Sequence, residues 1–451
     1  MIAAVTRLAA GRARDRRSGG KAWRAVRWEG IALLVLGLSC GGCQVTDMIR
    51  FSYDNAKATH NWAGVDHETS VPFTLIDNHI ILPVRINGSE PMNFVLDSGA
   101  GASVIMDSRR TRSLGLQASS QIGVSGVGAG PDPVANIVRN ATLAVGSLRL
   151  EGLSVVHLPI DSVPFFFELD DVYFDGVIGA PFFERFSIAI DYDARLVTFS
   201  DPPATAAVHG RGDEWTSIPL QIEDGVPYVR AQVTNAQGVE VTVKLLADTG
   251  AREALSLTPN THAGLRAPTK YFETVSKGLS GDIVSHVTML GSFAVGPYRT
   301  GELPVSFALA GGETENNSNG ILGNALLSRF NLVFDYSNEQ LLLTPNRRFA
   351  EPLLADRSGL LIRPHRRGAI VRDIAPDSAA AYSSIKVGDI ITSFDAFPVQ
   401  EQSVGDLKQA LASGVESVEL CWWTGVDSMC ETLVLASRFR SHAQCMTPAC
   451  S

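Results

Sequence analysis

Apolar and polar residues alternate near the start of the chain in a pattern that predicts a β-hairpin. Residues 83–88 alternate and end in Asn87-Gly88, a pair typical of tight hairpin turns, and the chain returns through the apolar residues 94–96. Sustained 3.6-residue periodicity is rare, apart from short stretches after Gly179 and Gly323. We therefore predict a mainly β protein.

The same pattern returns later in the chain. Residues 228–233 alternate, a turn follows at 235–238, and residues 239–243 lead the chain back. Each returning strand runs into an Asp-Ser/Thr-Gly-Ala sequence, first at Asp97 and then at Asp248. Repeated self-similarity of this kind predicts two similar structural units.

A second pair of matching segments supports the repeat. Val177-Ile178-Gly179 follows the first motif, and Ile321-Leu322-Gly323 follows the second. The copies are 151 residues apart at the aspartates and 144 at these glycines, in the same order. We predict two β-rich lobes, at residues 70–203 and 214–347, with a Pro/Ala-rich link at 202–207.

The doubled motif resembles that of the aspartic peptidases, specifically the retropepsin-like branch, over about 280 residues. The resemblance implies a bilobal β-barrel fold in which Asp97 and Asp248 face each other as the catalytic pair. Two facing carboxylates cannot both ionise cheaply, so one keeps a proton while the other is charged. The charged member would deprotonate a water that attacks the peptide carbonyl, and the neutral one would donate to the carbonyl oxygen.

The resemblance also implies a supporting set around the pair. Hydroxyl groups would tie the two loops together, glycines would allow close backbone approach, and the apolar-Gly segments would pack beneath the aspartates. These supporting residues are Ser98, Gly99, Thr249, Gly250, Ile178, Gly179, Leu322 and Gly323.

Two glycine-rich segments lie where the family places its flaps. They are residues 123–130 and 277–281, and glycine hinges suit a hairpin that closes over substrate. The candidate flap residues are Gly126, Gly128, Gly278 and Gly281. Flexible surface loops are the alternative interpretation. Arg252-Glu253 departs from the family by placing two charges directly after the second motif, and an inactive relative is a further alternative.

Residues 353–437 resemble a PDZ domain, most closely at Val387-Gly388-Asp389-Ile390-Ile391. The resemblance implies a small α+β domain that binds a peptide C-terminus as an added strand, with its carboxylate on backbone N–H groups. The corresponding loop is Gly359-Leu360-Leu361-Ile362, in which Leu361 replaces the second glycine of the family pattern. The alternative is a packing module that rigidifies the protease.

Composition and charge change the picture at the N-terminus. The 451 residues carry a net charge of −9, but residues 1–43 hold eight basic and two acidic residues, so this segment is +6 and the remainder −15. An apolar core at 31–38 and small residues follow, a pattern typical of a secretory signal. Cys40 and Cys43 make the segment similar to a lipobox, although neither has Leu at the usual position; a plain signal peptide or a start codon assigned too early are the alternatives.

The four other cysteines lie in the last 31 residues. Cys421 and Cys430 would sit opposite each other in a hairpin that turns at Gly425-Val426, near disulfide reach, and two buried free thiols are the alternative. Cys445 and Cys450 belong to a polar tail at 438–451 and could pair or remain free. No zinc-ligand spacing is present.

The sequence thus predicts an exported aspartic endopeptidase with a 44–69 linker after its leader, located in the periplasm or cell envelope. We expect a polypeptide substrate, a C-terminal peptide ligand for the PDZ-like module, attachment to the membrane by a lipid anchor, and a monomer. We expect no cofactor and no metal. The acidic body argues against nucleic-acid binding. The competing hypotheses are a non-catalytic envelope binding protein on the same fold and a protease that cleaves only its own chain.

Overall fold

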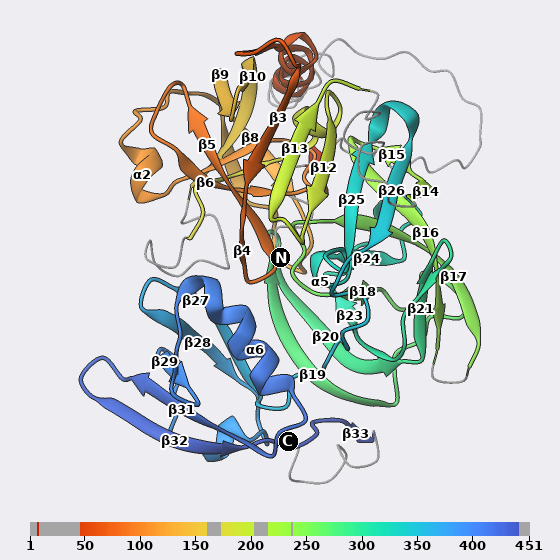
Figure 1. The fold of residues 1–451 in the computed structure, drawn as a ribbon, viewed down its shortest axis with the longest axis vertical. Coiled ribbons are helices and arrows are strands. Elements are labelled where there is room, and N and C mark those ends of the chain that lie inside the picture. The colour runs from red at the N-terminus through yellow and green to blue at the C-terminus, as the bar shows by residue number, and fades with distance from the viewer. Residues whose placement is uncertain (1–6, 9–45, 160–172, 203–214, 236–237, 442–451) are drawn as a thin grey trace, which may run out of the picture.

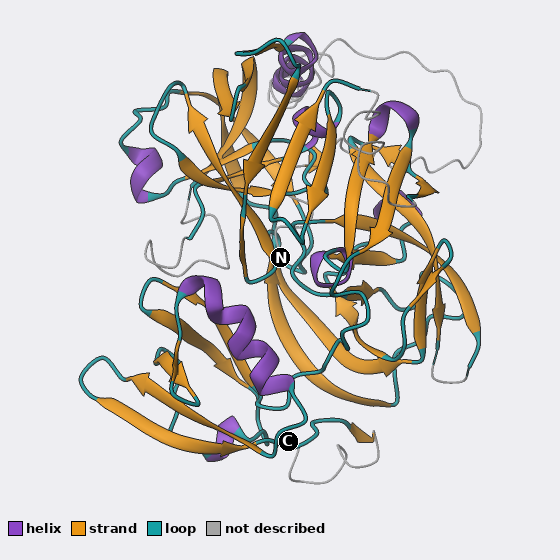
Figure 2. Cartoon of the chain, viewed as in Figure 1, coloured by secondary structure: helices purple, strands orange, loops and turns teal. Residues whose placement is uncertain are grey.

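The computed structural model describes residues 7–8, 46–159, 173–202, 215–235 and 238–441. Strands dominate these residues, as predicted, and only one described helix after the N-terminal region is longer than a single turn (Figure 2). Within the described residues, no helix is both long and apolar enough to cross a membrane. The strands form four sheets, which Figure 1 shows as two lobes and a smaller C-terminal module.

Lobe one is built on a sheet in the order β1-β8-β9-β10-β7-β11-β6-β5-β4, closed by pairing of β5 with β9 and extended by β2 on β10. The hairpin predicted at Asn87-Gly88 is confirmed: both residues have positive φ, and β5 pairs with β6. The strands are β1 (Arg7–Leu8), β2 (Thr59–Trp62), β4 (Thr74–Ile76), β5 (His79–Ile86), β6 (Met92–Leu96), β7 (Val104–Met106), β8 (Ala118–Ser125), β9 (Val134–Val145), β10 (Leu148–Leu158) and β11 (Gly176–Ile178).

Lobe two repeats this plan in the order β22-β21-β16-β17-β24-β18-β23-β20-β19-β33, with β15 on β16. The second predicted hairpin is also confirmed, because β16 pairs antiparallel with β17 from Tyr228 to Thr234. The strands are β15 (Gln221–Glu223), β16 (Val226–Thr234), β17 (Glu240–Asp248), β18 (Leu255–Leu257), β19 (Lys270–Gly278), β20 (Gly281–Leu290), β21 (Ser292–Val295), β22 (Tyr298–Arg299), β23 (Leu303–Ala310), β24 (Gly320–Gly323) and β33 (Arg440–Ser441).

A sheet shared by both lobes joins them. Its order is β14-β26-β25-β12-β13-β3, and β12 of lobe one pairs antiparallel with β25 of lobe two. Its inner face belongs to one continuous apolar core that includes Ile188, Phe199 and Phe334. The strands are β3 (Glu68–Pro72), β12 (Ser187–Asp191), β13 (Leu196–Ser200), β14 (Thr216–Pro219), β25 (Phe330–Asp335) and β26 (Gln340–Pro345).

The C-terminal module is a sheet in the order β27-β28-β29-β31-β32, with β30 on β29 and one helix, α6, packed against its core. Cys421 and Cys430 stand opposite each other on β31 and β32, and a disulfide joins them as expected. The elements are β27 (Leu360–His365), β28 (Gly368–Ile374), β29 (Ile390–Phe394), β30 (Phe397–Pro398), α6 (Val404–Ala412), β31 (Ser417–Trp423) and β32 (Ser428–Val434).

Short helices complete the fold. The two stretches of helical periodicity after Gly179 and Gly323 are confirmed as single-turn helices at equivalent places in the two lobes. The helices are α2 (Arg109–Arg112), α3 (Ala180–Phe183), α5 (Asn324–Leu327), and the 3-10 turns η3 (Glu315–Asn317), η4 (Tyr336–Asn338), η5 (Ala380–Tyr382) and η6 (Glu401–Ser403).

The structure differs from the sequence-based expectation before lobe one and after the C-terminal module. Residues 46–57 form a helix instead of a linker, and Arg139 of lobe one binds Asp47 and Asp54 of that helix. Strands β2 and β3 then add to existing sheet edges. The tail expected at 438–451 is partly structured, because β33 pairs with β19 of lobe two. Cys40, Cys43, Cys445, Cys450 and most of the 202–207 link lie outside the described residues.

Candidate active site

Each aspartate lies at the end of a strand that a second strand supports. Asp97 follows β6, which pairs in parallel with β11, and its N–H donates to the Ile178 carbonyl (3.0 Å). Asp248 ends β17, which pairs in parallel with β24, in register with Gly323. The two apolar-Gly segments therefore lie beside the aspartate loops, where sequence reasoning placed them.

The two loops are tied together across the lobes by a reciprocal hydroxyl network. The Ser98 hydroxyl donates to the Ala247 carbonyl (2.7 Å), and the Thr249 hydroxyl donates to the Leu96 carbonyl (2.8 Å). Each hydroxyl also accepts the backbone N–H of the other residue at 3.0 Å. Four hydrogen bonds among fully buried groups thus fix the two aspartate loops against each other.

The two carboxyl groups lie side by side. A β-carbon added to Gly99 would stand 2.6 Å from Cγ of Asp248, and one added to Gly250 would stand 2.2 Å from Cγ of Asp97. Any side chain at either glycine would therefore displace the aspartate of the opposite lobe. The Gly99 N–H donates to Oδ1 of Asp97 (2.9 Å), and the Gly250 N–H donates to Oδ1 of Asp248 (2.7 Å).

The remaining carboxylate oxygens set the chemistry of the pair. Both Oδ2 atoms are buried and accept no hydrogen bond from the other described groups of the chain, while the two carboxyl groups are close enough to hydrogen-bond to each other. Burial and then the charge of Asp248 raise the pKa of Asp97 well above its ordinary value, and burial raises the pKa of Asp248. Two such groups cannot both ionise cheaply, so the raised pKa values favour a pair that shares one proton.

Both glycine-rich segments are hairpin tips, and the tips meet. One tip joins β8 to β9, and the other joins β19 to β20 at Leu279-Ser280. The Ser280 N–H donates to the Val127 carbonyl (3.0 Å), and the Ser280 hydroxyl donates to Asp132 (2.6 Å). Gly128 permits this contact, because a β-carbon there would lie 2.3 Å from the Ser280 backbone and its φ is positive.

Each tip also inserts an apolar side chain into the opposite lobe. Val127, from lobe one, packs in a buried cluster of lobe two with Tyr228 and Ile321. Leu279, from lobe two, packs in a buried cluster of lobe one with Val95 and Phe174. Each tip thus packs against the opposite lobe, and we refer to the hairpin ends at residues 126–133 and 279–280 as the flap tips.

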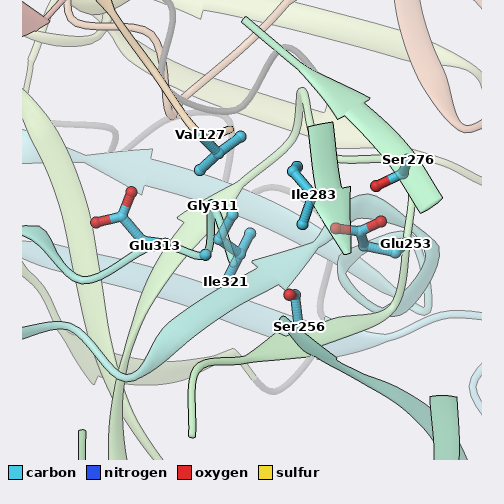
Figure 3. Close-up of a pocket in the computed structure, with 9 residues that line it drawn as sticks. Val127, Glu253, Ser256, Ser276, Ile283, Gly311, Glu313 and Ile321 are labelled. Atoms are coloured by element: carbon cyan, nitrogen blue, oxygen red, sulfur yellow. The ribbon is translucent and has the colours of Figure 1, made fainter. Parts of the chain in front are cut away.

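A pocket lies under the first flap tip on the lobe-two side (Figure 3). Val127, Ile283 and Ile321 form apolar walls, and Glu253 extends its carboxylate toward Ile283 and Ser276. Glu313 points to the opposite side in the same view. The Glu253 carboxylate lies in the field of Arg252 and Arg363, because its negative charge raises the pKa of both guanidinium groups.

The two charged residues that follow the second motif therefore point in different directions. Glu253 lines the pocket, whereas Arg252 turns away and binds Asp77 of lobe one at 2.5 Å. Sequence reasoning missed Asp77 and its neighbour His79, whose Nε2 contacts the Gly250 carbonyl (3.0 Å). The signal was an Asp-Asn turn between two short apolar runs, which alone predicts only a hairpin.

The loop expected to bind carboxylates in the C-terminal module is mostly strand. Gly359 has positive φ and precedes β27, whereas Leu360, Leu361 and Ile362 already belong to that strand. Within the described ranges, no group of three or more His, Cys, Asp or Glu side chains could hold a metal ion.

These features define a β-rich protein with paired, buried aspartates between two similar lobes. A family model described as aspartyl protease matches residues 82–182, which include Asp97 and Gly179. The chain is therefore similar to aspartyl proteases over these residues of lobe one. No curated protein matches the chain.

Proposed function

We propose that the chain is an aspartic endopeptidase in which Asp97 and Asp248 act together on one water. One observation carries the proposal: two motifs from two lobes bring their carboxyl groups together at a buried point, and each keeps one oxygen that accepts no hydrogen bond from other described groups of the chain. The family match to residues 82–182 supports a protease generally. The second aspartate comes from the same chain, so a monomer suffices.

The mechanism follows from the shared proton. The ionised carboxylate takes a proton from the water as the water attacks the peptide carbonyl, and the protonated carboxyl donates to the carbonyl oxygen. The backbone N–H groups of Gly99 and Gly250 hold the Oδ1 atoms and leave the Oδ2 atoms for these transfers. The flap tips exclude bulk water once substrate is bound.

The test is cleavage of an unfolded protein substrate by wild type, Asp97→Asn and Asp248→Asn. We expect each variant to lose at least about 10³-fold in kcat, because either change removes the charged or the proton-donating form of the pair. Asp66→Asn is the matched control, since Asp66 is exposed and distant in the sequence from both motifs. Equal activity of all four proteins would exclude the assignment.

The same assay separates the competing hypotheses. A binding protein would retain the unfolded substrate without cleaving it in the wild type as well as in the variants. A protease that acts only on its own chain would show a shorter mass for the purified wild type than for Asp97→Asn, with no cleavage of added substrate.

We also propose that the enzyme is exported and carries a PDZ-like module at residues 353–437. The Cys421–Cys430 disulfide supports export, because structural disulfides persist mainly in oxidising compartments. A sheet with α6 beside β27 supports the PDZ-like assignment, since PDZ domains bind peptides between a strand and a helix. Cell fractionation and the mass of the N-terminal peptide test export and lipid attachment at Cys40 or Cys43.

A further inference from the structure

A turn of lobe one holds the loop that follows the lobe-two aspartate. The turn between β4 and β5 contacts residues 250–252 with three successive side chains. Asp77 binds the Arg252 guanidinium (2.5 Å), Asn78 donates to the Arg252 carbonyl (2.9 Å), and His79 contacts the Gly250 carbonyl (3.0 Å). These contacts reach to within two residues of Asp248.

The C-terminal module completes this cluster. Lys408 of α6 binds Oδ1 of Asp77, while Arg252 binds Oδ2, so each oxygen of the carboxylate has a cation of its own. Figure 1 shows α6 and β27 at the side of the module that faces the lobes. Asp77 is only 3% exposed. One buried carboxylate therefore joins lobe one, lobe two and the module.

The charges of the cluster show how strongly these groups interact. Burial alone would raise the pKa of Asp77, but Lys408, Arg252 and Arg363 lower it well below its ordinary value. Burial lowers the pKa of Lys408 to about 8, in spite of Asp77. Since each cation loses hydration in this setting, the arrangement is stable only while Asp77 is charged and in place.

The equivalent turn of lobe two makes no such cluster. There Asp224-Gly225 occupies the place of Asp77-Asn78, with positive φ at both residues, but Asp224 is exposed and its carboxylate accepts from the Asn316 amide (3.1 Å) instead of binding a cation in the described part of the chain. After the first motif, Gly101 stands where lobe two has Arg252. The charged cluster thus occurs at the lobe-one turn, where the module contacts the lobes, and not at the equivalent turn of lobe two.

We propose that the C-terminal module is a working part of the active site, with Lys408 and Asp77 as positioning residues for the loop that carries Asp248. The chain of contacts runs from Lys408 to Asp77, then to Arg252, and then to the backbone at residues 250–251, whose N–H groups hold the Asp248 carboxylate. This inference rests on the proposed peptidase function for its kinetic consequence only.

The kinetic test compares Lys408→Met, Lys408→Arg and Asp77→Asn with wild type. We expect Lys408→Met and Asp77→Asn to lower kcat about 10- to 100-fold with KM changed less than about threefold, because a small displacement of a reacting group affects the chemical step most. Lys408→Arg keeps the charge and should recover part of kcat. Lys386→Met, an exposed lysine of the same module, is the control.

A structural readout makes the inference independent of catalysis. Hydrogen–deuterium exchange of the peptide covering residues 246–252 should be faster in Lys408→Met than in wild type and in Lys386→Met, at a temperature where circular dichroism shows all three folded. Unchanged exchange together with unchanged kcat would overturn the proposal. Wild-type protein that cleaves nothing would instead contradict the proposed function, while the exchange result would still decide the role of the module.

Discussion

At the scale of single residues, the site depends on positions where any side chain would be too large. Gly99 and Gly250 each lie against the carboxyl group of the opposite lobe. The sequence indicates both glycines through the repeated motif, but only the three-dimensional arrangement shows that each limits the distance between the aspartates. The network of Ser98 and Thr249 then fixes that distance with hydrogen bonds across the lobes.

The raised pKa of Asp97 predicts a stability effect with a definite sign. A carboxyl group whose pKa is higher in the folded than in the unfolded protein stabilises the fold at low pH and costs stability as pH rises above the unfolded value of about 4. Asp97→Asn should therefore match wild type near pH 3 and exceed it at pH 7, by about 1.4 kcal/mol for each unit of displacement.

Urea unfolding at several pH values measures this difference. Asp66→Asn, at an exposed position, should follow the wild-type curve throughout. Parallel curves for wild type and Asp97→Asn would contradict the prediction. An inactive but more stable variant would show that the aspartate pair lowers the stability of the fold while it serves catalysis.

Glu253 predicts a substrate preference. Its carboxylate lines a small pocket beneath the flap tip together with Glu313, Ser256 and Ser276, so a lysine or arginine side chain of a substrate that opens this pocket would meet negative charge there (Figure 3). We expect Glu253→Gln to lower kcat/KM for peptides with a basic side chain about tenfold relative to peptides with leucine, an effect typical of a partly exposed ion pair. A peptide library reports the ratio, and Glu302→Gln, which is exposed, should leave it unchanged.

At the scale of elements, the flaps gain their closed position by exchanging side chains. Leu279 is fully buried, yet its neighbours belong to lobe one, whereas its own hairpin belongs to lobe two. Its burial therefore stabilises the closed flap instead of the lobe core. Opening of the hairpin must expose this leucine and break the Ser280 contacts.

Leu279→Ala should accordingly open the flap without unfolding the lobes. Loss of a buried leucine costs about 2–5 kcal/mol, so exchange within residues 270–290 should accelerate by at least about 30-fold. Exchange of the strands that carry the aspartates should stay the same. Leu309→Ala removes the same group from a 43% exposed position and should change neither region. Equal acceleration across the whole of lobe two would show that Leu279 supports the lobe itself.

Elements defined by local pattern were predictable, whereas those defined by distant partners were not. The two hairpins follow from alternation and turn residues, so the sequence alone predicts β5, β6, β16 and β17. The segment 44–69 has no such pattern. It gains structure from contacts with distant residues, because Arg139 binds its helix and its two strands pair with β10 and β13. The Asp77 cluster was hidden for the same reason, since its members lie 331 residues apart at the widest.

At the scale of the whole molecule, the two lobes and the C-terminal module share buried contacts. The sheet that pairs β12 with β25 joins the lobes through backbone hydrogen bonds and a common core. The module is joined through the Asp77 cluster, through Arg438, which lies over the Phe272 ring at 4.0 Å, and through the pairing of β33 with β19 just after the module. The lobes should therefore unfold together, while attachment of the module depends in part on charge.

This difference predicts the pattern of thermal unfolding. Calorimetry of wild type near pH 7 should show one transition, because the cluster holds the module to the lobes even though the Lys408 side chain is 36% exposed and its ion pair is partly screened by solvent. Lys408→Met should separate an earlier transition of the module from that of the lobes, whereas Lys386→Met should not.

The pKa of Asp77 is depressed, so the stability it contributes is present above about pH 4 and is lost as pH falls further. Wild type well below pH 3 should then approach the two-step unfolding of Lys408→Met, and a single transition in that variant at every pH would mean that apolar contacts, not the cluster, hold the module in place.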